Sequence, residues 1–585
     1  MLQQARQVLK QYFGYDSFRI GQEQVIQNVL EGRDTLCVMP TGGGKSVCYQ
    51  IPSLCSDGTT IVISPLISLM KDQVDILRSN GIPAAFINSS LTYSQIDQTM
   101  EDVRNGLTKL LYIAPERLEN ESFCKELSQL NVPFVAIDEA HCISQWGHDF
   151  RPSYRIISNL VSLWNKKPTL IALTATATPS VIDDICSLLA IDEEDVYITG
   201  FSRENLSFKV LVGVDKDKYV KKYIQSYPNE TGIIYAATRK SVESVYEMLL
   251  KSGVRVAKYH AGMTETERTK EQNRFLNDEV QIIVATNAFG MGINKTNVRF
   301  VIHYQMPRNM ESYYQEAGRA GRDGLPSECI LLYSSVDEQT QRFLIDQSLD
   351  RSRIPFELKK LQTMVDYCHT QHCLQAYIVE YFGEQVSQEC GQCGNCTDER
   401  PKTDVTEETQ KVLSCVVRMG QKFGKTITAD VLAGARNKKV VDFKHLSTYG
   451  ILKPMSSKEV SRFIEFLIAE KLLSVKPGQY PTIYVSEKGK EVLMGDRKVL
   501  RRLSEEPKVV IKDDPLFEHL RALRKQIADR ESVPPFVVFS DKTLRDMCEK
   551  KPIDEESFLD VSGVGQNKLE RYGEVFIEAI REFVS

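Results

Sequence analysis

Short apolar runs of four or five residues recur through the first 335 residues of this chain, and they alternate with stretches of helical composition. Predominantly apolar runs of this length indicate strands buried on both faces, and intervening helices join such strands in parallel. The first series consists of residues 35–39, 60–63, 110–113, 134–137 and 170–173. The second series consists of residues 232–235, 256–259, 281–284 and 300–303. The pattern predicts two α/β domains in tandem, residues 1–200 and residues 201–335.

The rest of the chain lacks this alternation and predicts three further units. Residues 336–400 combine helical composition with a cluster of cysteines. Residues 405–502 mix helices with a hairpin signal at residues 476–480, and the last unit, residues 513–585, is expected to be small and all-helical. Two polar or charged stretches, residues 397–408 and 503–515, are expected to be linkers.

Composition and charge narrow the class of protein. The chain has 585 residues, of which 42% are hydrophobic, and a net charge of -5. Because no apolar run approaches about 18 residues, and no apolar stretch follows the first residues, we expect a cytoplasmic protein without a membrane partner. The net charge hides a basic region, since residues 405–502 contain 19 Lys and Arg against 10 Asp and Glu. Such a surplus can bind nucleic-acid phosphates.

A glycine-rich loop at residues 39–46 lies between the first apolar run and a helical stretch. Glycines let backbone N–H groups curl around phosphates, while the lysine reaches the β/γ-phosphates and the hydroxyl binds Mg²⁺. The loop therefore predicts an ATP site with Lys45 on the phosphates and Ser46 on Mg²⁺, although Met39 replaces the first glycine of the usual pattern. The other loop residues expected to bind the nucleotide are Thr41, Gly42, Gly43 and Gly44.

An acidic pair, Asp138 and Glu139, directly follows the apolar run at residues 134–137. A carboxylate at a strand end can hold Mg²⁺, and its neighbour can orient or deprotonate the attacking water. We assign the first role to Asp138 and the second to Glu139. Because acidic pairs also cap helices, the assignment depends on Lys45 upstream.

Side chains that could bind a base precede the phosphate loop. A glutamine such as Gln22 can pair with N6 and N7 of adenine, and Tyr15 or Arg19 can stack on the ring. The same residues would suit the start of an ordinary helix.

The stretch from residue 314 to residue 322 carries Gln315, Arg319 and Arg322 in the second α/β domain. The spacing predicts that both arginines lie on one helix face. An arginine supplied across a domain cleft stabilises the charge on a transferring γ-phosphoryl group. The flanking glycines and Gln315 favour this role over surface ion pairing.

Three cysteines, Cys390, Cys393 and Cys396, lie within seven residues. In a reducing compartment this spacing predicts a zinc site rather than a disulfide. An iron–sulfur cluster could also use four cysteines. The residue types and positions leave four candidates for the fourth ligand, namely Cys368, His369, His372 and Cys373.

Several of these segments together resemble superfamily 2 helicases. They are residues 18–22, 40–46, 138–141, 174–176 and 315–322. The stretch from residue 141 to residue 154 is more specific, because it resembles the aromatic-rich loop of RecQ-family DNA helicases. The resemblance covers nearly the whole chain. It implies two tandem RecA-like parallel-sheet domains, a zinc-binding helical segment, a winged-helix domain and a helicase-and-RNaseD C-terminal (HRDC) domain.

The resemblance also implies how DNA is bound. In the family, the aromatic loop couples DNA binding to ATP hydrolysis, so Trp146 and Phe150 are expected to stack on bases and Arg151 to contact the DNA backbone. The winged-helix region is expected to bind duplex DNA, with Arg436 and Lys438 on phosphates.

For the nucleotide and the metal, the resemblance implies that Arg322 is the arginine finger and Arg319 a second γ-phosphate sensor. It assigns Tyr15, Arg19 and Gln22 to adenine. It also selects Cys373, seventeen residues before the triplet, as the fourth zinc ligand.

The activity implied is that of an ATP-dependent 3′-to-5′ DNA helicase in recombination, repair and replication-fork processing, with ATP, Mg²⁺ and Zn²⁺ as cofactors. Its expected partners are single-stranded, duplex and forked DNA, and a single-strand-binding protein or other repair proteins. Two alternatives use the same residues: an RNA helicase or duplex translocase on the same motor, and a non-catalytic DNA-binding scaffold. The presence of Lys45, Glu139 and Arg322 argues against the scaffold.

Overall fold

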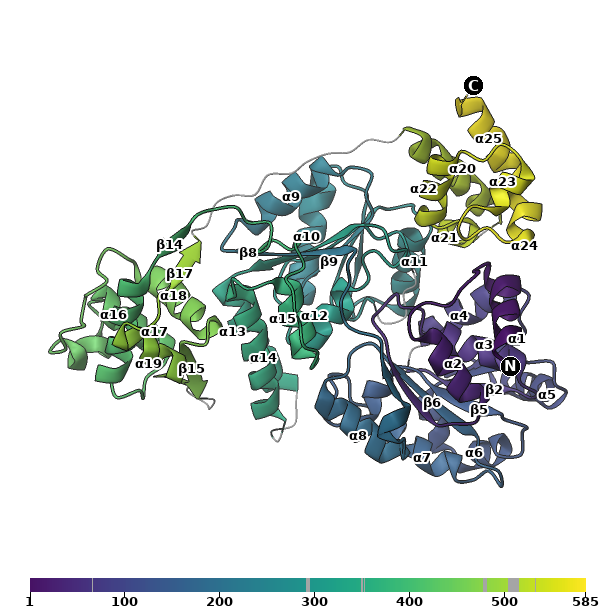
Figure 1. Ribbon diagram of the computed structural model, residues 1–585, viewed down its shortest axis with the longest axis horizontal. Coiled ribbons are helices and arrows are strands. Elements are labelled where there is room, and N and C mark those ends of the chain that lie inside the picture. Colours follow the sequence, from purple (N-terminus) through teal and green to yellow (C-terminus); the bar gives the residue numbers. More distant parts are fainter. Residues whose placement is uncertain are drawn as a thin grey trace.

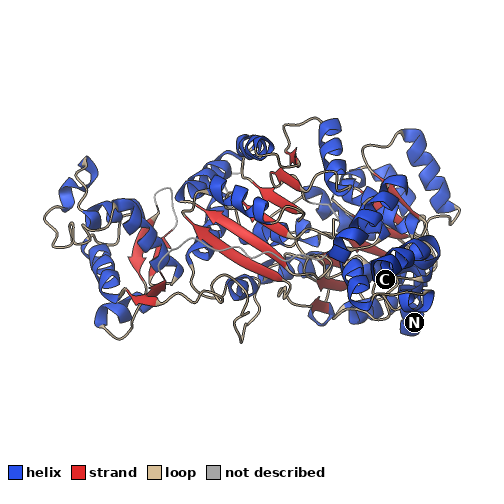
Figure 2. Ribbon diagram, turned by 90° about the horizontal axis from the view of Figure 1, so that it is seen from above, coloured by secondary structure: helices blue, strands red, loops and turns tan. Residues whose placement is uncertain are grey.

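The computed structural model describes residues 1–65, 67–290, 295–348, 351, 353–476, 481–502, 515–531 and 533–584. Figure 1 shows an elongated molecule with the unit formed by residues 402–502 at one end. Two sheet domains fill the rest of its length, and the C-terminal helices lie above the N-terminal helix α1 (Leu2–Val8). Seen from above in Figure 2, the strands of the sheets run between layers of helices.

The first sheet is parallel and seven-stranded, with the order β3-β4-β2-β5-β6-β1-β7. Its strands are β1 (Thr35–Val38), β2 (Thr60–Ile63), β3 (Ala84–Ile87), β4 (Leu110–Ile113), β5 (Phe134–Ile137), β6 (Thr169–Thr174) and β7 (Val196–Ile198). Leu36 and Val38 pack into one hydrophobic core and Cys37 into another. Both faces of the sheet are therefore buried, which explains the uninterrupted apolar runs in the sequence. The two strands that the pattern did not predict, β3 and β7, are the edge strands.

Helices connect these strands and cover both faces of the sheet. They are α2 (Gln22–Leu30), α3 (Val47–Cys55), α4 (Ile67–Ser79), α5 (Tyr93–Arg104), α6 (Glu121–Leu127), α7 (Ile156–Val161) and α8 (Pro179–Leu189). Local sequence sets their ends. Thr92 and Gln95, for example, form a reciprocal capping box at the start of α5, which satisfies backbone donors that the helix itself leaves free.

The second sheet is also parallel, with six strands in the order β10-β11-β9-β12-β13-β8. Its strands are β8 (Leu206–Val212), β9 (Gly232–Tyr235), β10 (Val256–Tyr259), β11 (Ile282–Ala285), β12 (Phe300–His303) and β13 (Ser327–Tyr333). Its helices are α9 (Lys216–Ser226), α10 (Arg239–Lys251), α11 (Glu265–Leu276) and α12 (Met310–Ala317). The prediction of two parallel-sheet domains is confirmed. A short segment, residues 199–205, joins the sheets.

A helical segment follows, made of α13 (Ser335–Ser348), α14 (Ile354–His369) and α15 (Leu374–Tyr381). The cysteine loop comes after α15 and is attached to the second sheet, because the Gly394 N–H donates to the Phe208 carbonyl on β8 at 2.7 Å. The second domain and this segment also share one hydrophobic core.

The next unit has its own core, which includes Val412, Phe463 and Leu467. It contains α16 (Thr406–Arg418), α17 (Lys425–Ala433), α18 (Ser457–Ala469), the antiparallel hairpin β15 (Leu473–Lys476) and β16 (Thr482–Val485), and α19 (Glu487–Met494). The hairpin agrees with the prediction, while its turn at residues 477–480 lies outside the described residues.

The expected linker at residues 397–408 is wrong in its second half. Residues 402–404 form β14 (Lys402–Asp404), which pairs with β17 (Leu500–Arg502), and α16 begins two residues later. The polar side chains suit this position because all three β14 residues are exposed. The other expected linker lies mostly at residues 503–514, outside the described part of the chain.

The C-terminal unit is all-helical, as predicted. Its helices are α20 (Pro515–Glu531), α21 (Pro535–Val538), α22 (Asp541–Lys550), α23 (Glu555–Leu559), α24 (Gln566–Lys568) and α25 (Glu574–Val584). The unit packs against the second sheet domain through α20: Arg521 donates to the Asn229 carbonyl and Lys525 to the Asp278 carbonyl, each at 2.8 Å.

Candidate functional site

The phosphate loop, residues 39–46, leaves the carboxyl end of β1 and enters α3. Gly42 and Gly44 have φ values of +82° and +86°, a conformation that favours glycine. A Cβ atom on Gly44 would also lie 2.5 Å from the Gln22 side chain. Within the loop, the Lys45 ammonium donates to the carbonyls of Met39 at 3.1 Å and Pro40 at 3.4 Å. The loop thus curls around the lysine that is expected to meet the phosphates.

The acidic pair follows β5, which lies two strands from β1 in the sheet. Burial raises the pKa of Asp138 to about 7, and the Glu139 carboxylate adds to this effect while Lys45 opposes it. Burial lowers the pKa of Lys45, whereas Glu139 and Asp138 raise it. Two partly buried carboxylates therefore face one ammonium, and a divalent cation would compensate the excess negative charge. Asp138 and Ser46 both line the cleft between the two sheet domains and fit the role of Mg²⁺ ligands.

The side chains expected to bind adenine lie beside the phosphate loop. Arg19 donates to the Gly42 carbonyl, and the Gln22 amide donates to the carbonyls of Gly44 at 3.0 Å and Gly43 at 3.3 Å. The Gln22 side-chain oxygen accepts from the Arg19 N–H at 2.8 Å. In this conformation both side chains therefore brace the loop backbone. Tyr15, which is 45% exposed, lies at the edge of the cleft.

The second domain supplies Gln315 from α12, but the predicted helical placement of the two arginines is wrong. The helix ends at Ala317, and Arg319 and Arg322 lie in the turns that follow. Gly321 has a φ of +58°, which is incompatible with a continuing α-helix. All three side chains still line the cleft that contains the phosphate loop.

The two sheet domains meet at this cleft. A Cβ atom on Gly318 would lie 1.9 Å from the Thr41 hydroxyl oxygen, so the second domain can approach the loop this closely only with glycine at that position. Burial and the nearby Arg319 and Arg203 guanidinium groups lower the pKa of Arg322 to about 9. Such a concentration of positive charge suits an anionic phosphate.

The cleft between the domains encloses about 370 Å³. It gathers nearly all the residues that the sequence assigned to ATP and to its hydrolysis. These are Tyr15, Arg19, Gln22, Thr41, Gly42, Gly44, Lys45, Ser46, Asp138, Glu139, Gln315, Arg319 and Arg322. Gly43 belongs to the loop but does not line the cleft.

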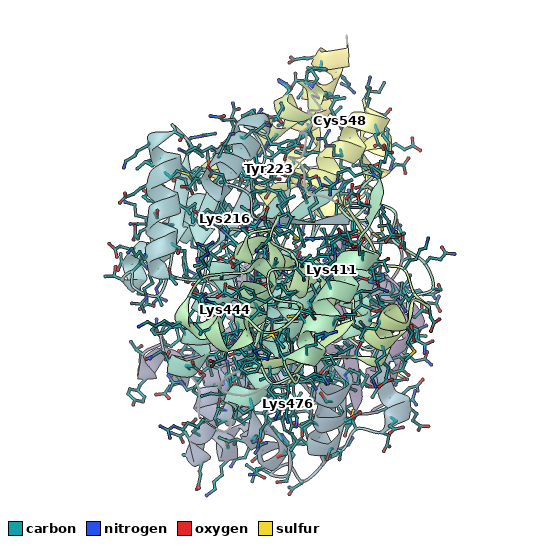
Figure 3. The ribbon with its side chains drawn as sticks, turned by 90° about the vertical axis from the view of Figure 1, so that its left-hand side faces the viewer. Lys216, Tyr223, Lys411, Lys444, Lys476 and Cys548 are labelled. Carbon is teal, nitrogen blue, oxygen red and sulfur yellow. The ribbon has the colours of Figure 1, made fainter. Side chains whose placement is uncertain are left out.

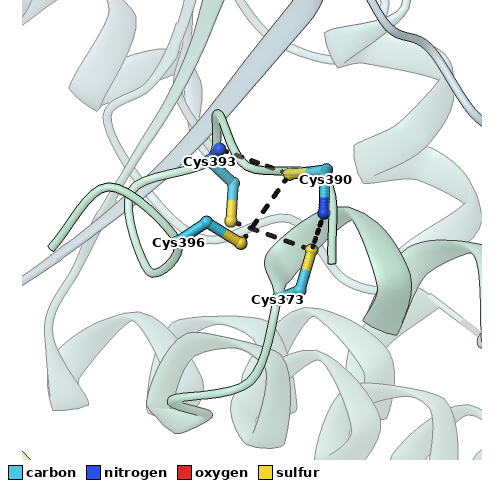
Figure 4. Close-up of side chains that lie close together, drawn as sticks. All are labelled: Cys373, Cys390, Cys393 and Cys396. Atoms are coloured by element: carbon cyan, nitrogen blue, oxygen red, sulfur yellow. Dashed lines mark hydrogen bonds between the residues drawn. The ribbon is translucent and has the colours of Figure 1, made fainter. Parts of the chain in front are cut away.

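The structure also brings four cysteines together (Figure 4): Cys373, Cys390, Cys393 and Cys396. Their sulfur atoms lie within 4.8 Å of one another, and two of the pairs are 4.0 Å apart. Tetrahedral zinc with Zn–S bonds of about 2.3 Å requires sulfur atoms separated by roughly 3.8 Å. The donor set and spacing therefore fit zinc.

Backbone N–H groups around the cluster point at the sulfur atoms. Cys390 and Ala376 donate to the Cys373 sulfur at 3.3 and 3.4 Å, and Leu374 donates to the Cys393 sulfur at 3.3 Å. Such donors stabilise thiolates that bind a metal. The two histidines considered as ligands are engaged elsewhere, since His369 pairs with Glu465 at 3.1 Å and His372 with Glu470 at 3.3 Å.

The central part of the aromatic loop, residues 144–151, follows the acidic pair along the first domain. Trp146 is 46% exposed and its ring packs edge-on against Phe356 of α14, with ring centroids 5.3 Å apart. Phe150 carries the Arg155 guanidinium over its ring at 5.4 Å. Arg151 donates to the Pro65 carbonyl at 2.9 Å and to Asp149 at 3.1 and 3.2 Å. Trp146 is thus available for stacking, whereas Arg151 is held by neighbouring protein groups.

The expected duplex contacts belong to the unit at residues 402–502, which lies at one end of the molecule (Figure 1). Arg436 and Lys438 are exposed at the turn between α17 and the following short helix. Figure 3 views this end of the molecule and shows Lys411, Lys444 and Lys476 spread over the same unit. The structure therefore separates the basic region from the ATP cleft.

Two residues at the domain junctions make contacts that the sequence did not predict. Arg203, in the segment joining the sheets, donates to the carbonyls of Thr41, Ala320 and Gly321. Lys360 on α14 donates to the Trp146 carbonyl at 3.1 Å and pairs with Glu311 at 2.6 Å. Neither lies in a recognisable motif, so only an alignment of relatives could have singled them out from sequence.

Family models match the chain along nearly its whole length. In order, they describe a DEAD/DEAH box helicase at residues 19–185, a helicase conserved C-terminal domain at 215–324, a RecQ zinc-binding domain at 335–397, an RQC domain at 399–509 and an HRDC domain at 513–580. Each model falls on one structural unit described above.

Two curated relatives align from end to end. The ATP-dependent DNA helicase RecQ of Bacillus subtilis is 54% identical, with 100% of this chain and 99% of the relative covered. The protein of the same name from Haemophilus influenzae is 42% identical, with 99% and 96% covered. Within the described residues, no helix has both the length and the apolar character required to cross a membrane.

Proposed function

Because the chain belongs to the RecQ family of ATP-dependent DNA helicases, we propose that it hydrolyses ATP to move 3′ to 5′ along single-stranded DNA and to unwind duplexes. The observation that best supports this proposal is the cleft in which Lys45 and Glu139 of the first domain face Arg319 and Arg322 of the second. A nucleotide bound there would be contacted by both domains, so its hydrolysis would change how they fit together.

In the proposed reaction, Lys45 and the loop backbone bind the β- and γ-phosphates. Glu139 orients the attacking water, and Arg322 stabilises charge on the γ-phosphoryl group. Arg319 and Gln315 contact the γ-phosphate and so sense whether it is bound. Mg²⁺, held by Ser46 and Asp138, would neutralise phosphate charge when bound. Tyr15, Arg19 and Gln22 would hold the adenine, which requires the two latter side chains to exchange their present contacts with the loop.

The DNA strand is proposed to pass over the aromatic loop, with bases stacking on Trp146 and Phe150. Arg151 would contact the strand backbone after leaving Asp149. The unit at residues 402–502 would bind the duplex through Arg436 and Lys438, and the strands would separate between this unit and the aromatic loop. We place this activity in the cytoplasm, in DNA recombination and repair, with single-strand-binding or other repair proteins as partners.

An RNA helicase on the same motor is the second candidate, and relative stimulation of ATP hydrolysis separates the two. Single-stranded DNA should raise the turnover number much more than RNA of the same length and sequence. Equal stimulation by both would favour the RNA-helicase alternative, and no stimulation by either would favour the scaffold. The Lys45→Ala variant, purified in the same way, measures ATP hydrolysis by contaminating enzymes.

A further inference from the structure

Three parts of the molecule that are distant in sequence meet at the Lys360 side chain. Its ammonium group contacts the Glu311 carboxylate of α12 at 2.6 Å and the Trp146 carbonyl of the aromatic loop at 3.1 Å. It also lies 4.7 Å from the centre of the Phe356 ring, which packs against Trp146. One ammonium on α14 therefore joins the second motor domain to the aromatic loop of the first.

The ion pair at this junction is buried. The side chains of Lys360 and Glu311 are 8% and 3% exposed. Burial raises the pKa of the Glu311 carboxyl, but Lys360 outweighs burial and the net pKa lies below its ordinary value. The ionised Glu311 carboxylate therefore depends on its lysine partner, because an unpaired buried charge is strongly unfavourable.

On the second domain, this pair is coupled to the nucleotide side of α12. Glu311 lies in the first turn of the helix, and Gln315 lies four residues later on the same face. The helix then leads into the turns that hold Arg319 and Arg322. A shift of Glu311 would therefore move the start of the rigid element that carries Gln315 to the ATP cleft.

On the first domain, the aromatic loop is linked to the acidic pair through two histidine rings. The His148 ring stacks on His141, with centroids 4.3 Å apart, and His141 lies 3.4 Å from the Glu139 carboxylate. Neither His148 nitrogen has a hydrogen-bond partner in the described part of the chain. Burial, with the adjacent His141 next in effect, lowers the pKa of His148 to about 3, so this contact is made by a neutral ring.

These contacts give the loop two connections to the hydrolytic centre, one inside its own domain and one across the domain junction. The second depends on Lys360, because the Trp146 carbonyl and the Glu311 carboxylate share its ammonium. A DNA base that stacks on the exposed face of Trp146 acts on the residue whose backbone Lys360 holds. Resting on the proposed function, we infer that Lys360 is a positioning residue that transmits DNA binding at Trp146 to α12 and thereby stimulates ATP hydrolysis.

The test compares ATP hydrolysis with and without a saturating thymidine oligonucleotide. For Lys360→Met, the ratio of DNA-saturated to DNA-free turnover should fall about tenfold or more, since small displacements of positioned groups cost this much. Lys360→Arg, which keeps the charge and can still donate to both partners, should recover most of the ratio. The matched control is the exposed neighbour on the same helix, Lys359→Met, which should leave both rates unchanged.

DNA binding is followed separately by tryptophan emission, because Trp146 and Trp164 are the only tryptophans in the sequence. In a Trp164→Phe background, the emission reports Trp146 alone. Lys360→Met should retain DNA-dependent quenching, with a half-saturating DNA concentration within about threefold of the parent, while losing stimulation. A purely structural role would instead lower both turnover rates in parallel or abolish quenching.

The outcomes separate the inference from the proposed function. A parent protein without DNA-stimulated hydrolysis contradicts the proposed function. Normal stimulation in the parent and an unchanged ratio in Lys360→Met overturn the inference alone. If Lys360→Met does not unfold cooperatively on heating, Glu311→Gln, which keeps the side-chain size, is tested in its place. An unchanged ratio of DNA-saturated to DNA-free turnover in that variant also overturns the inference.

Discussion

Arg203 donates a hydrogen bond to the backbone carbonyl of Thr41, so the segment between the two sheet domains directly contacts the phosphate loop. The same guanidinium donates to the Ala320 carbonyl at 3.3 Å and the Gly321 carbonyl at 3.1 Å, in the turn before Arg322. One side chain thereby connects the phosphate loop to the turn that carries Arg322, the proposed arginine finger.

Arg203→Lys should impair hydrolysis because lysine lacks the planar fork that reaches three carbonyls. We expect the turnover number to fall about 10- to 100-fold, as misplacement of catalytic groups predicts, with a smaller change in KM for ATP. The control is the adjacent Glu204→Gln, whose side chain is exposed. Equal turnover in Arg203→Lys and the parent would show that the bridge does not position the arginine turn.

Lys45→Ala should abolish hydrolysis, because the ammonium at the centre of the phosphate loop is lost. A decrease of about a thousandfold or more is expected for removal of such a phosphate-binding charge. Binding of single-stranded DNA, measured by fluorescence anisotropy without nucleotide, should remain within a few-fold of the parent. Unwinding by this variant would be incompatible with the assigned ATP site.

Removal of zinc should destabilise the segment that joins the motor to the remaining units. Cys393→Ser is expected to lose the zinc measured by mass spectrometry and to melt at a lower temperature, since metal-binding energy contributes directly to folding. Cys55→Ser, at a partly buried cysteine outside the cluster, is the control and should retain the metal. A full zinc content in Cys393→Ser would contradict the assigned ligand set.

Glu465 should stabilise the contact between the unit at residues 402–502 and α14 of the helical segment. It is 2% exposed and pairs with Lys425 at 2.9 Å and His369 at 3.1 Å. Glu465→Gln should lower the free energy of unfolding by about 3 kcal/mol, as expected when a buried pair loses one partner. Glu487→Gln, at an exposed pair, should change it by less than about 1 kcal/mol.

The effect of Glu465 should also depend on pH. Burial raises the pKa of this carboxyl, but His369 and Lys425 outweigh burial and lower it from 4.5 to about 2. A carboxyl with a lowered folded-state pKa stabilises the protein above its unfolded pKa and loses that effect as pH falls through the folded value. The difference in free energy of unfolding between the parent and Glu465→Gln should therefore be largest at pH 7. In denaturant titrations it should shrink between about pH 5 and pH 2. A difference that grows on acidification would contradict the pairing.

Sequence predicted the central parts of the molecule well because buried parallel strands impose a strong pattern. The runs that became β1, β2, β4, β5 and β6 are apolar on both faces, and the phosphate loop follows one of them directly. The arginines were misplaced on a helix because their spacing of three suits a helix, while the φ of Gly321 breaks it. Strand β7 was not predicted because its apolar run, Val196–Ile198, has only three residues.

The residues that connect parts of the molecule could not be predicted in this way. Arg203 acts through backbone carbonyls, which leave no trace in the sequence of the partner. Lys360 and Glu311 lie 49 residues apart in the sequence, and a lysine on an amphipathic helix is normally expected to face solvent. Such contacts depend on how domains pack, a level of structure that local pattern does not specify.

The measurement that tests the proposed helicase function and its direction most directly is unwinding of otherwise identical duplexes with a 3′ tail or a 5′ tail, with ATP and Mg²⁺. We predict that the duplex with the 3′ tail is separated and the duplex with the 5′ tail is not, with no separation by Lys45→Ala. Separation only from the 5′ tail would contradict the proposed direction, and separation of neither duplex alongside active ATP hydrolysis would contradict the helicase function itself.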